Sequence, residues 1–344
     1  MTAMQNDHWG LSGRPFQLTP DPRFWFESAT HKKAMAYLGY GLAQGEGFVV
    51  ITGEVGAGKT TLSGHLIESL DPARVNAVRL VSTQLSGDDL LRAVAIGLGL
   101  PVEGTDKSHL LARIETHVRD RDRAGQRTLL IVDEAQGLSH EALEELRMLS
   151  NFQGTDRALI QTLLLGQPEF RERIDTAPEL EQLRQRIIAS HHLTAMAADE
   201  VGAYVLHRMK LVGWTGAPAF AENAFAALHR HSGGLPRRIN HLMTRVLLLG
   251  SIEQAGTIDA AMVEAVAADL AQDHPGPDQG SLRLVEGGTR VPDAHALDHA
   301  ARIAMLEAQV EEQGAALRRV LSLMVEWAEA PEPQSGDIRR KPAA

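Results

Sequence analysis

Residues 53–60 read Gly-Glu-Val-Gly-Ala-Gly-Lys-Thr and match the pattern G-x-x-x-x-G-K-[ST], the strongest constraint on the fold of this chain. The apolar residues 48–51 before it predict a buried strand, and residues 61–67 after it predict an amphipathic helix. A glycine-rich turn between a strand and a helix lets backbone N–H groups converge on a phosphate, and the helix N-terminus adds a positive dipole end. Such a turn need not bind anything, so the assignment needs a second motif.

That second motif is residues 129–134, an apolar run that ends in Asp133 and Glu134. It predicts a parallel strand buried on both faces, with its carboxylates at the sheet edge where ligands bind. Asp133 is expected to hold the Mg²⁺ shell, and Glu134 to orient and deprotonate an attacking water. The alternative is a core strand followed by the acidic first turn of a solvated helix. The two motifs together predict an ATP hydrolase.

The residues expected to bind the nucleotide are those of the first motif, in which Lys59 reaches the β- and γ-phosphates. They are Gly53, Glu54, Val55, Gly56, Ala57, Gly58, Lys59, Thr60 and Thr61. Thr60 and Asp133 are the expected metal ligands, so the predicted cofactors are ATP and Mg²⁺. A small-molecule kinase is disfavoured because the adjacent Asp133 and Glu134 suit attack by water and no acceptor site is evident.

Composition limits the alternatives. The chain has 344 residues, a formal net charge of -10 and no cysteine, which argues against a broadly basic nucleic-acid surface and excludes disulfides and thiolate metal sites. Residues 1–10 lack the pattern of a signal peptide, and no uncharged apolar run approaches the ~18 residues of a membrane span. We therefore expect a cytoplasmic protein without a direct membrane span, peripheral at the inner membrane at most, through a partner.

Hydrophobic periodicity predicts an α/β fold. Further strands are expected at residues 76–82, 128–133, 159–165 and 187–193, and helices at 31–41, 88–97, 108–124 and 141–152. Strands separated by helices imply a doubly wound parallel sheet of five strands with right-handed crossovers. From about residue 198 the strand signals stop, and four helices are expected at 199–212, 221–231, 236–249 and 259–270.

The segment before the first strand is unusually aromatic. Residues 9–26 contain Trp9, Phe16, Phe24, Trp25 and Phe26, five of the fifteen aromatic residues, interspersed with prolines. An irregular arm packed on the following domain is expected. Such an arm could cover an adenine base, or it could simply pack, and the sequence favours simple packing.

Five phrases in this order carry a family resemblance: residues 15–22 (PFQLTPDP), 53–61 (GEVGAGKTT), 132–136 (VDEAQ), 165–169 (LGQPE) and 233–240 (GGLPRRIN). The chain resembles the AAA+ ATPases, and within them the ExeA/GspA-like secretion ATPases, most of all the subfamily associated with exosortase and PEP-CTERM loci. The resemblance covers about residues 9–272. It implies a P-loop NTPase core and a helical lid.

The resemblance also implies roles for further positions. Gln167, at the end of the fourth strand, would be sensor 1, in reach of the γ-phosphate or the attacking water; otherwise it caps a loop. Arg237, at the start of a lid helix, would be sensor 2, with Arg238 the neighbour that could be confused with it. Arg186 is favoured over Arg184 as an arginine finger offered to an adjacent subunit, because it lies nearer the fifth strand. The alternative is a solvated basic helix end.

The C-terminal part is expected to be an interaction element. Eight positions, apolar except for Gln313, follow a heptad pattern of alternating three and four spacing: Ile303, Leu306, Val310, Gln313, Leu317, Val320, Met324 and Trp327. This helix either self-associates as a coiled coil or docks on a partner. The expected regions are an arm at 1–30, an AAA+ core at 31–196, a lid at 197–272, a linker at 273–293, this helix at 294–330 and a disordered tail at 331–344.

Two functions remain open. In the first, implied by the resemblance, an oligomeric ATPase energises or gates an envelope export or exopolysaccharide system of the exosortase type, contacting a membrane-complex partner through the C-terminal helix. In the second, the chain is a DNA-associated AAA+ ATPase of the transposition or replication-initiation type. The densest basic stretch, residues 119–127, is interrupted by Asp120 and Asp122, so a nucleic-acid partner is disfavoured.

Overall fold

The computed structural model describes residues 8–81, 85–154 and 157–273, which belong to one compact unit. The first seven residues of the expected arm, nearly all of the linker, the heptad helix and the tail lie outside the described residues. None of the described helices combines the length and the apolar character that crossing a membrane requires.

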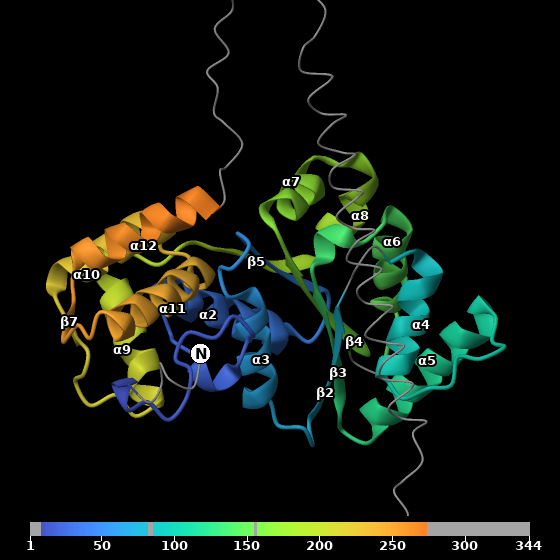
Figure 1. Ribbon diagram of the computed structural model, residues 1–344. Helices are drawn as coiled ribbons and strands as arrows, with labels where there is room; N and C mark the ends of the chain where they lie inside the picture. Colours follow the sequence, from blue (N-terminus) through green and yellow to red (C-terminus); the bar gives the residue numbers. More distant parts are fainter. Residues whose placement is uncertain (1–7, 82–84, 155–156, 274–344) are drawn as a thin grey trace, which may run out of the picture. The chain divides into compact units, whose positions relative to one another are not determined.

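The five predicted strands form one parallel sheet (Figure 1). They are β1 (Phe48–Gly53), β2 (Val75–Val81), β3 (Arg127–Asp133), β4 (Ile160–Gly166) and β5 (Ile187–Leu193). Their order is β2-β3-β4-β1-β5, so the end of β4 lies between the ends of β1 and β3. The strand that leads into the glycine-rich loop therefore has a neighbouring strand on each side, and the predicted α/β class with a doubly wound sheet is confirmed.

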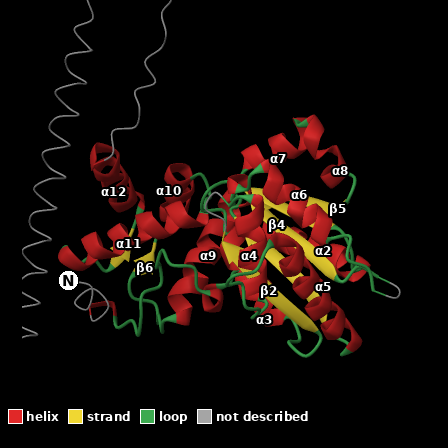
Figure 2. Ribbon diagram, turned by 90° about the vertical axis from the view of Figure 1, so that its right-hand side faces the viewer, coloured by secondary structure: helices red, strands yellow, loops and turns green. Residues whose placement is uncertain are grey.

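Helices cover both faces of the sheet (Figure 1, Figure 2). Alternate residues of each strand point to opposite faces. Val49 and Ile51 of β1 pack with one layer, which consists of α2 (Ala29–Gln44) and α3 (Lys59–Ser69). Phe48 and Val50 face the other layer. That layer comprises α4 (Gly87–Gly97), α5 (Lys107–Arg123), α6 (His140–Leu149), α7 (Pro168–Thr176) and α8 (Glu181–Arg184).

Four further helices follow the sheet, as expected, and share their own apolar core. They are α9 (Ala198–Leu211), α10 (Glu222–Ser232), α11 (Pro236–Ile252) and α12 (Ala260–Asp273). Figure 2 shows α10, α11 and α12 gathered beside the sheet. One expectation was wrong: strands do not stop at residue 198, because β6 (Ala219–Phe220) and β7 (Thr257–Ile258) form a short parallel pair.

The aromatic arm is part of this second core. Trp9, Phe16 and Phe24 are buried among α9, α11 and α12, and the short 3-10 helix Pro22–Phe24 closes the arm. The indole N–H of Trp9 donates to the carbonyl of Leu247 (3.1 Å), and Thr244 donates to the carbonyl of Phe16 (3.0 Å). Most of the arm therefore packs on the helices that follow the sheet, whereas Trp25 stacks on His65 of α3.

Candidate functional site

The glycine-rich loop has the backbone geometry that its sequence predicts. Gly56 and Gly58 have φ values of 86° and 102°, in a region that side chains rarely adopt. A Cβ on Gly58 would also lie 2.7 Å from Nε2 of His31, and a Cβ on Gly56 would lie 2.5 Å from Cβ of Arg237. Glycine is therefore required twice at this loop, by conformation and by space.

Lys59 begins α3 and is buried, with 6% of its surface exposed. Its Nζ donates to the carbonyl oxygens of Gly53 (2.6 Å) and Glu54 (3.1 Å). Burial lowers the pKa of Lys59, an effect opposed by the charges of Glu134 and Asp133. An ammonium group held by neutral carbonyls at a helix N-terminus suits an anionic ligand such as a phosphate.

Asp133, at the end of β3, is 3% exposed and meets Thr60 across the sheet edge. The hydroxyl of Thr60 donates to Oδ2 of Asp133 (2.9 Å). Adjacent carboxylate and hydroxyl oxygens are hard donors that suit Mg²⁺, so the two predicted metal ligands fit the ion.

Arg79, on β2, was missed from the sequence. Its Nη2 donates to the same oxygen of Asp133 (2.8 Å), although the paired register aligns Arg79 with Ile131. A cation on Oδ2 would share that oxygen with the guanidinium or displace it. The only sequence signal is an arginine inside an otherwise apolar strand, which does not indicate its partner.

Glu134 adopts a left-handed backbone conformation with φ of 56°, rare for a residue other than glycine. Its Oε2 accepts hydrogen bonds from the side-chain amides of Gln136 (2.5 Å) and Gln167 (3.2 Å). Burial raises the pKa of Glu134, but the two amides and the charge of Lys59 outweigh it, so the pKa lies below its usual value. The carboxylate is therefore ionised at neutral pH and available as a proton acceptor.

Gln136 is the last residue of the VDEAQ motif, and the sequence assigned it no role. Its Oε1 accepts from the backbone N–H of Gln167 (3.1 Å), so one amide joins the ends of β3 and β4. Gln167 reaches Glu134 because β4 lies between β1 and β3. The predicted alternative, a loop cap, does not describe its side chain, although Gln167 does precede the first turn of α7.

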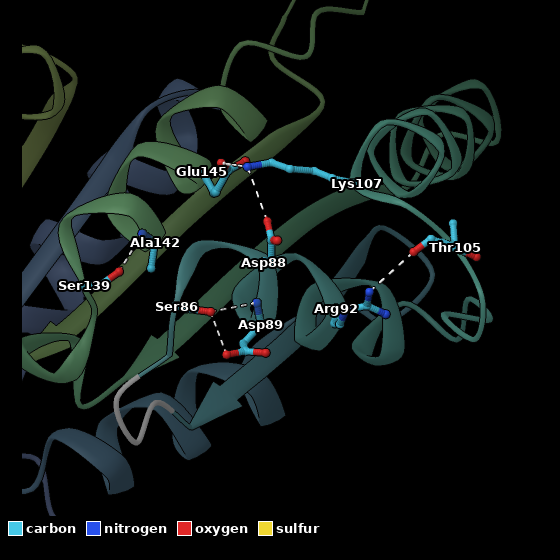
Figure 3. A network of polar contacts seen from close by, with 9 residues as sticks. All are labelled: Ser86, Asp88, Asp89, Arg92, Thr105, Lys107, Ser139, Ala142 and Glu145. Carbon is cyan, nitrogen blue, oxygen red and sulfur yellow. Dashed lines mark hydrogen bonds and ion pairs between the residues drawn. The ribbon is translucent and has the colours of Figure 1, made fainter.

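The segment after Glu134 is anchored by a polar network between helices (Figure 3). Lys107 Nζ lies 2.5 Å from Glu145 of α6 and 3.5 Å from Asp88 of α4, and so joins three helices. Ser139 caps α6 by accepting from the N–H of Ala142 (3.1 Å), and its own N–H donates to the carbonyl of Leu85. These contacts fix Ser139 and the start of α6 at His140, four residues after Gln136.

A cavity of about 290 Å³ lies over the loop. Its lining includes Lys59, Thr60 and Glu134 on the sheet side, and Arg237 and Trp25 opposite them. The backbone N–H of Arg237 donates to the carbonyl of Gly56 (3.2 Å), which brings the start of α11 against the loop; Arg238 does not line the cavity. The cavity is large enough to be a small-molecule site.

The far wall of the cavity includes a buried arginine that the sequence did not indicate. Arg208 is 7% exposed; it donates to the carbonyl of Pro15 (2.6 Å) and to the hydroxyl of Tyr204 (3.1 Å). Its guanidinium lies 4.5 Å from the ring centroid of Phe24, a cation–π contact. The Tyr204 hydroxyl in turn donates to Asn240 of α11 (2.7 Å). Arg208 thus fastens the arm to α9.

Arg186 does not join the other predicted residues. It immediately precedes β5, and its carbonyl accepts from the N–H of Phe48 at the start of β1. It is therefore about 20 Å, the length of a seven-residue strand, from the loop edge of the sheet. Its guanidinium donates to Ser150 (3.0 Å), whereas Arg184 pairs with Glu181 (2.9 Å) and donates to two carbonyls.

The sequence is similar to that of known proteins. Residues 42–174 match the family model of the AAA domain. Over 246 residues the chain is 39% identical to General secretion pathway protein A of Aeromonas hydrophila, an alignment that covers 71% of this chain and 44% of that protein. The chain thus spans less than half the length of that relative.

Solved structures share the fold at low identity. The Aeropyrum pernix ORC1 protein in complex with DNA aligns at a TM-score of 0.57 and 13% identity, over 76% of this chain and 70% of that one. Cdc6p from Pyrobaculum aerophilum aligns at a TM-score of 0.54 and 17% identity, over 74% of this chain and 68% of that one. Residues 42–174 therefore match an AAA domain, and the chain has the α/β fold of the P-loop NTPases.

Proposed function

We propose that this chain binds ATP with Mg²⁺ and hydrolyses it. The observation that carries the proposal is the Glu134 carboxylate, ionised and held by two amides at the edge of the cavity that Lys59 and Thr60 also line. A carboxylate so placed suits removal of a proton from water, whereas a binding module would not need it.

Each residue has a part in this reaction. Lys59 exchanges its two carbonyl partners for phosphate oxygens, which are stronger acceptors for an ammonium group. Glu134 takes the proton of the attacking water, and Gln167 and Arg237 act as sensors of the γ-phosphate, the roles that the family resemblance implies. A Mg²⁺ ion on Thr60 and Asp133, when bound, supplies charge stabilisation to the transferred phosphoryl group.

The test is Glu134→Gln. This variant should bind ATP with unchanged affinity but turn over about 10²- to 10⁴-fold more slowly, because the amide cannot accept the proton. Phosphate release and a binding titration measure the two quantities. Glu68→Gln, on the exposed side of α3, is the matched control and should keep the wild-type rate. Wild-type turnover in Glu134→Gln would contradict the assignment of Glu134 as the proton acceptor.

We further propose that Arg186 serves the active site of a neighbouring copy, so that the active form is an oligomer. Its place at the opposite edge of the sheet puts it out of reach of its own loop. A guanidinium offered to the transferred phosphoryl group of another subunit stabilises its developing charge. Arg184 is less suited, because three acceptors of its own chain already occupy it.

Mixing experiments test this second proposal. Arg186→Ala should lower the rate about 10³-fold. Adding Lys59→Ala subunits should restore activity, because they donate an intact Arg186 to loops that still bind ATP. Arg184→Ala is the control and should lower stability more than rate. If the mixture stays inactive, the site is not shared between subunits.

For the cellular role, we propose that the hydrolysis cycle energises or gates an envelope export or exopolysaccharide system of the exosortase and PEP-CTERM type, in the cytoplasm beside the inner membrane. The likeness to a general secretion pathway protein supports the secretion part. A membrane-complex partner would bind through residues 294–330, which remain a prediction. Purifying the Glu134→Gln form with ATP from cells and identifying what accompanies it tests this role.

A DNA-associated ATPase is the second candidate, since the similar Aeropyrum pernix ORC1 protein is described in complex with DNA. The basic stretch on α5 gives it little support. Arg119 pairs with Glu115 (2.6 Å), Arg123 donates to Asp120 (3.1 Å), and Arg121 donates to Gln126 (2.8 Å). Arginines already held by acceptor groups of their own chain are less available to phosphates. Duplex DNA accompanying the purified variant would instead favour this role.

A further inference from the structure

Gln136 has two hydrogen-bonding partners, and each belongs to a predicted catalytic residue. Its amide nitrogen donates to Oε2 of Glu134, and its amide oxygen accepts from the backbone N–H of Gln167. Gln136 itself lies in the 3-10 turn Ala135–Gly137, half-buried, and it does not line the cavity. Both ends of the Gln136 amide are therefore hydrogen-bonded to predicted catalytic residues, outside the cavity. Such an amide suits the orientation of those residues and not the binding of a ligand.

The backbone under Gln136 is held in a single arrangement. The left-handed conformation of Glu134 is stabilised by Asp133, whose Oδ1 accepts from the Glu134 N–H (3.1 Å). The Gly137 N–H then donates to the Glu134 carbonyl (2.9 Å) and closes the turn. Ala135, between the two side chains, is completely buried. The turn therefore presents the side chains of residues 134 and 136 to each other from a fixed base.

The carboxylate of Glu134 is held on one side only. Within the described parts of the chain, the hydrogen bonds donated to this group both go to Oε2, from Gln136 and Gln167. Two donors on one oxygen define the plane of the carboxylate and leave Oε1 as the acceptor for a proton from water. Gln167 alone, at 3.2 Å, would leave the group free to rotate about its last bond.

We infer that Gln136 is a positioning residue for hydrolysis, which aims the Glu134 carboxylate at the attacking water and ties it to the end of β4. The inference rests on the proposed function for its catalytic consequence. Gln136 lies outside the cavity lining. It acts through Glu134 and through Gln167, so that the general base and the predicted sensor keep one relative geometry.

Two substitutions separate this role from simple packing. Gln136→Met fills the same space without either hydrogen bond. Gln136→Glu keeps an oxygen for the Gln167 N–H but cannot donate to Glu134. Both should lower kcat about 10- to 100-fold, because misplacing a reacting group by about 1 Å has that effect, with KM changed less than about twofold. Gln44→Ala, exposed at the end of α2, is the control.

A double-mutant cycle with Gln167→Ala provides the next readout. If Gln136 and Gln167 hold the carboxylate as one unit, the double variant should be no slower than about twice the slower single variant. Multiplied effects would mean that the two amides act independently and would overturn the inference. Full activity of Gln136→Glu would overturn it too, since that variant retains only the contact with Gln167.

Binding of ADP with aluminium fluoride, a mimic of the transferred phosphoryl group, gives a readout without turnover. Gln136→Met should weaken this complex about 10-fold and leave the affinity for ADP alone within twofold. Equal losses for both ligands would indicate a general structural defect and would contradict the inference. If the wild-type protein neither hydrolysed ATP nor bound this mimic, the proposed function would fail. If the wild type hydrolysed ATP and Gln136→Met bound the mimic as tightly as the wild type does, the positioning role alone would fail.

Discussion

The two walls of the cavity are built in different ways. The sheet wall, defined as the loop 53–61 and Glu134 with residues 133, 136 and 167, which hydrogen-bond to them without lining the cavity, is polar and lies at strand ends. The arm wall, defined as residues 15–26 with Tyr204, Arg208 and Asn240, is aromatic and has one buried cation. The sheet wall offers polar and charged groups that suit a phosphate, and the arm wall offers aromatic surface that suits an apolar ring.

The separations along the chain differ as much as the chemistry. On the sheet wall, Lys59 donates to carbonyls five and six residues away. On the arm wall, Arg208 reaches Pro15 across 193 positions, and Thr244 reaches Phe16 across 228. Substitutions on the sheet wall should therefore change ligand binding and leave the fold intact, whereas those on the arm wall should change stability first.

The largest expected effect is that of Lys59→Ala on the sheet wall. Removal of the ammonium group should weaken ATP binding about 1,000-fold, since it eliminates a charge held at a helix N-terminus for an anion. Thermal unfolding without nucleotide should change little. A titration with ATP and a melting curve measure the two. An unchanged ATP affinity would contradict the assignment of phosphate binding to the sheet wall, because the phosphate contacts would then lie elsewhere.

His31 lies where the two walls meet and should give the next largest effect. It is packed under Gly58, contacts Trp25 edge-on, and shares a hydrogen bond with Ser28 (2.7 Å). Burial lowers its pKa to about 4, against the smaller opposing effects of a hydrogen bond to Ala57 and the charge of Glu200. His31 is therefore neutral in the folded protein at neutral pH.

This depressed pKa makes stability dependent on pH. Above pH 6.5 His31 is neutral in both states; as the pH falls toward 4 the unfolded chain takes up the proton first, and stability is lost. The loss is about 3 kcal/mol from this group. Urea unfolding at pH 7.5 and at pH 4 should show that the free energy of unfolding falls less for His31→Gln than for the wild type. His241→Gln, exposed on α11, should behave as wild type.

The smallest effect is expected for Arg208→Met on the arm wall. The carbonyl of Pro15 and the hydroxyl of Tyr204 each lose a donor, which should cost about 1–3 kcal/mol of unfolding free energy. ATP affinity should fall only as far as the arm loosens. Urea unfolding and an ATP titration compare the two quantities. A loss of ATP affinity without a loss of unfolding free energy would indicate that Arg208 contacts the ligand and does not hold the arm.

Much of the fold follows from local patterns. The buried runs predicted all five strands of the sheet, and Ser86, Asp106 and Ser139 cap α4, α5 and α6 as such residues do. The boundaries were less certain: the helix expected to reach residue 152 ends at Leu149. The pair β6 and β7 was missed because two residues are too few to show a period.

The sequence by itself determined the sheet wall, because a phosphate loop needs its glycines, lysine and threonine within one turn of backbone. The same holds for Asp133 and Glu134, which follow an apolar strand directly. Only the tertiary structure decided which side chains lie next to these residues. Strand order placed Gln167 between the loop and Glu134, and cross-strand contact brought Arg79 to Asp133. Chain folding over some 190 residues brought Arg208 to the arm. Such contacts depend on which surfaces pack together, and no spacing along the chain records that.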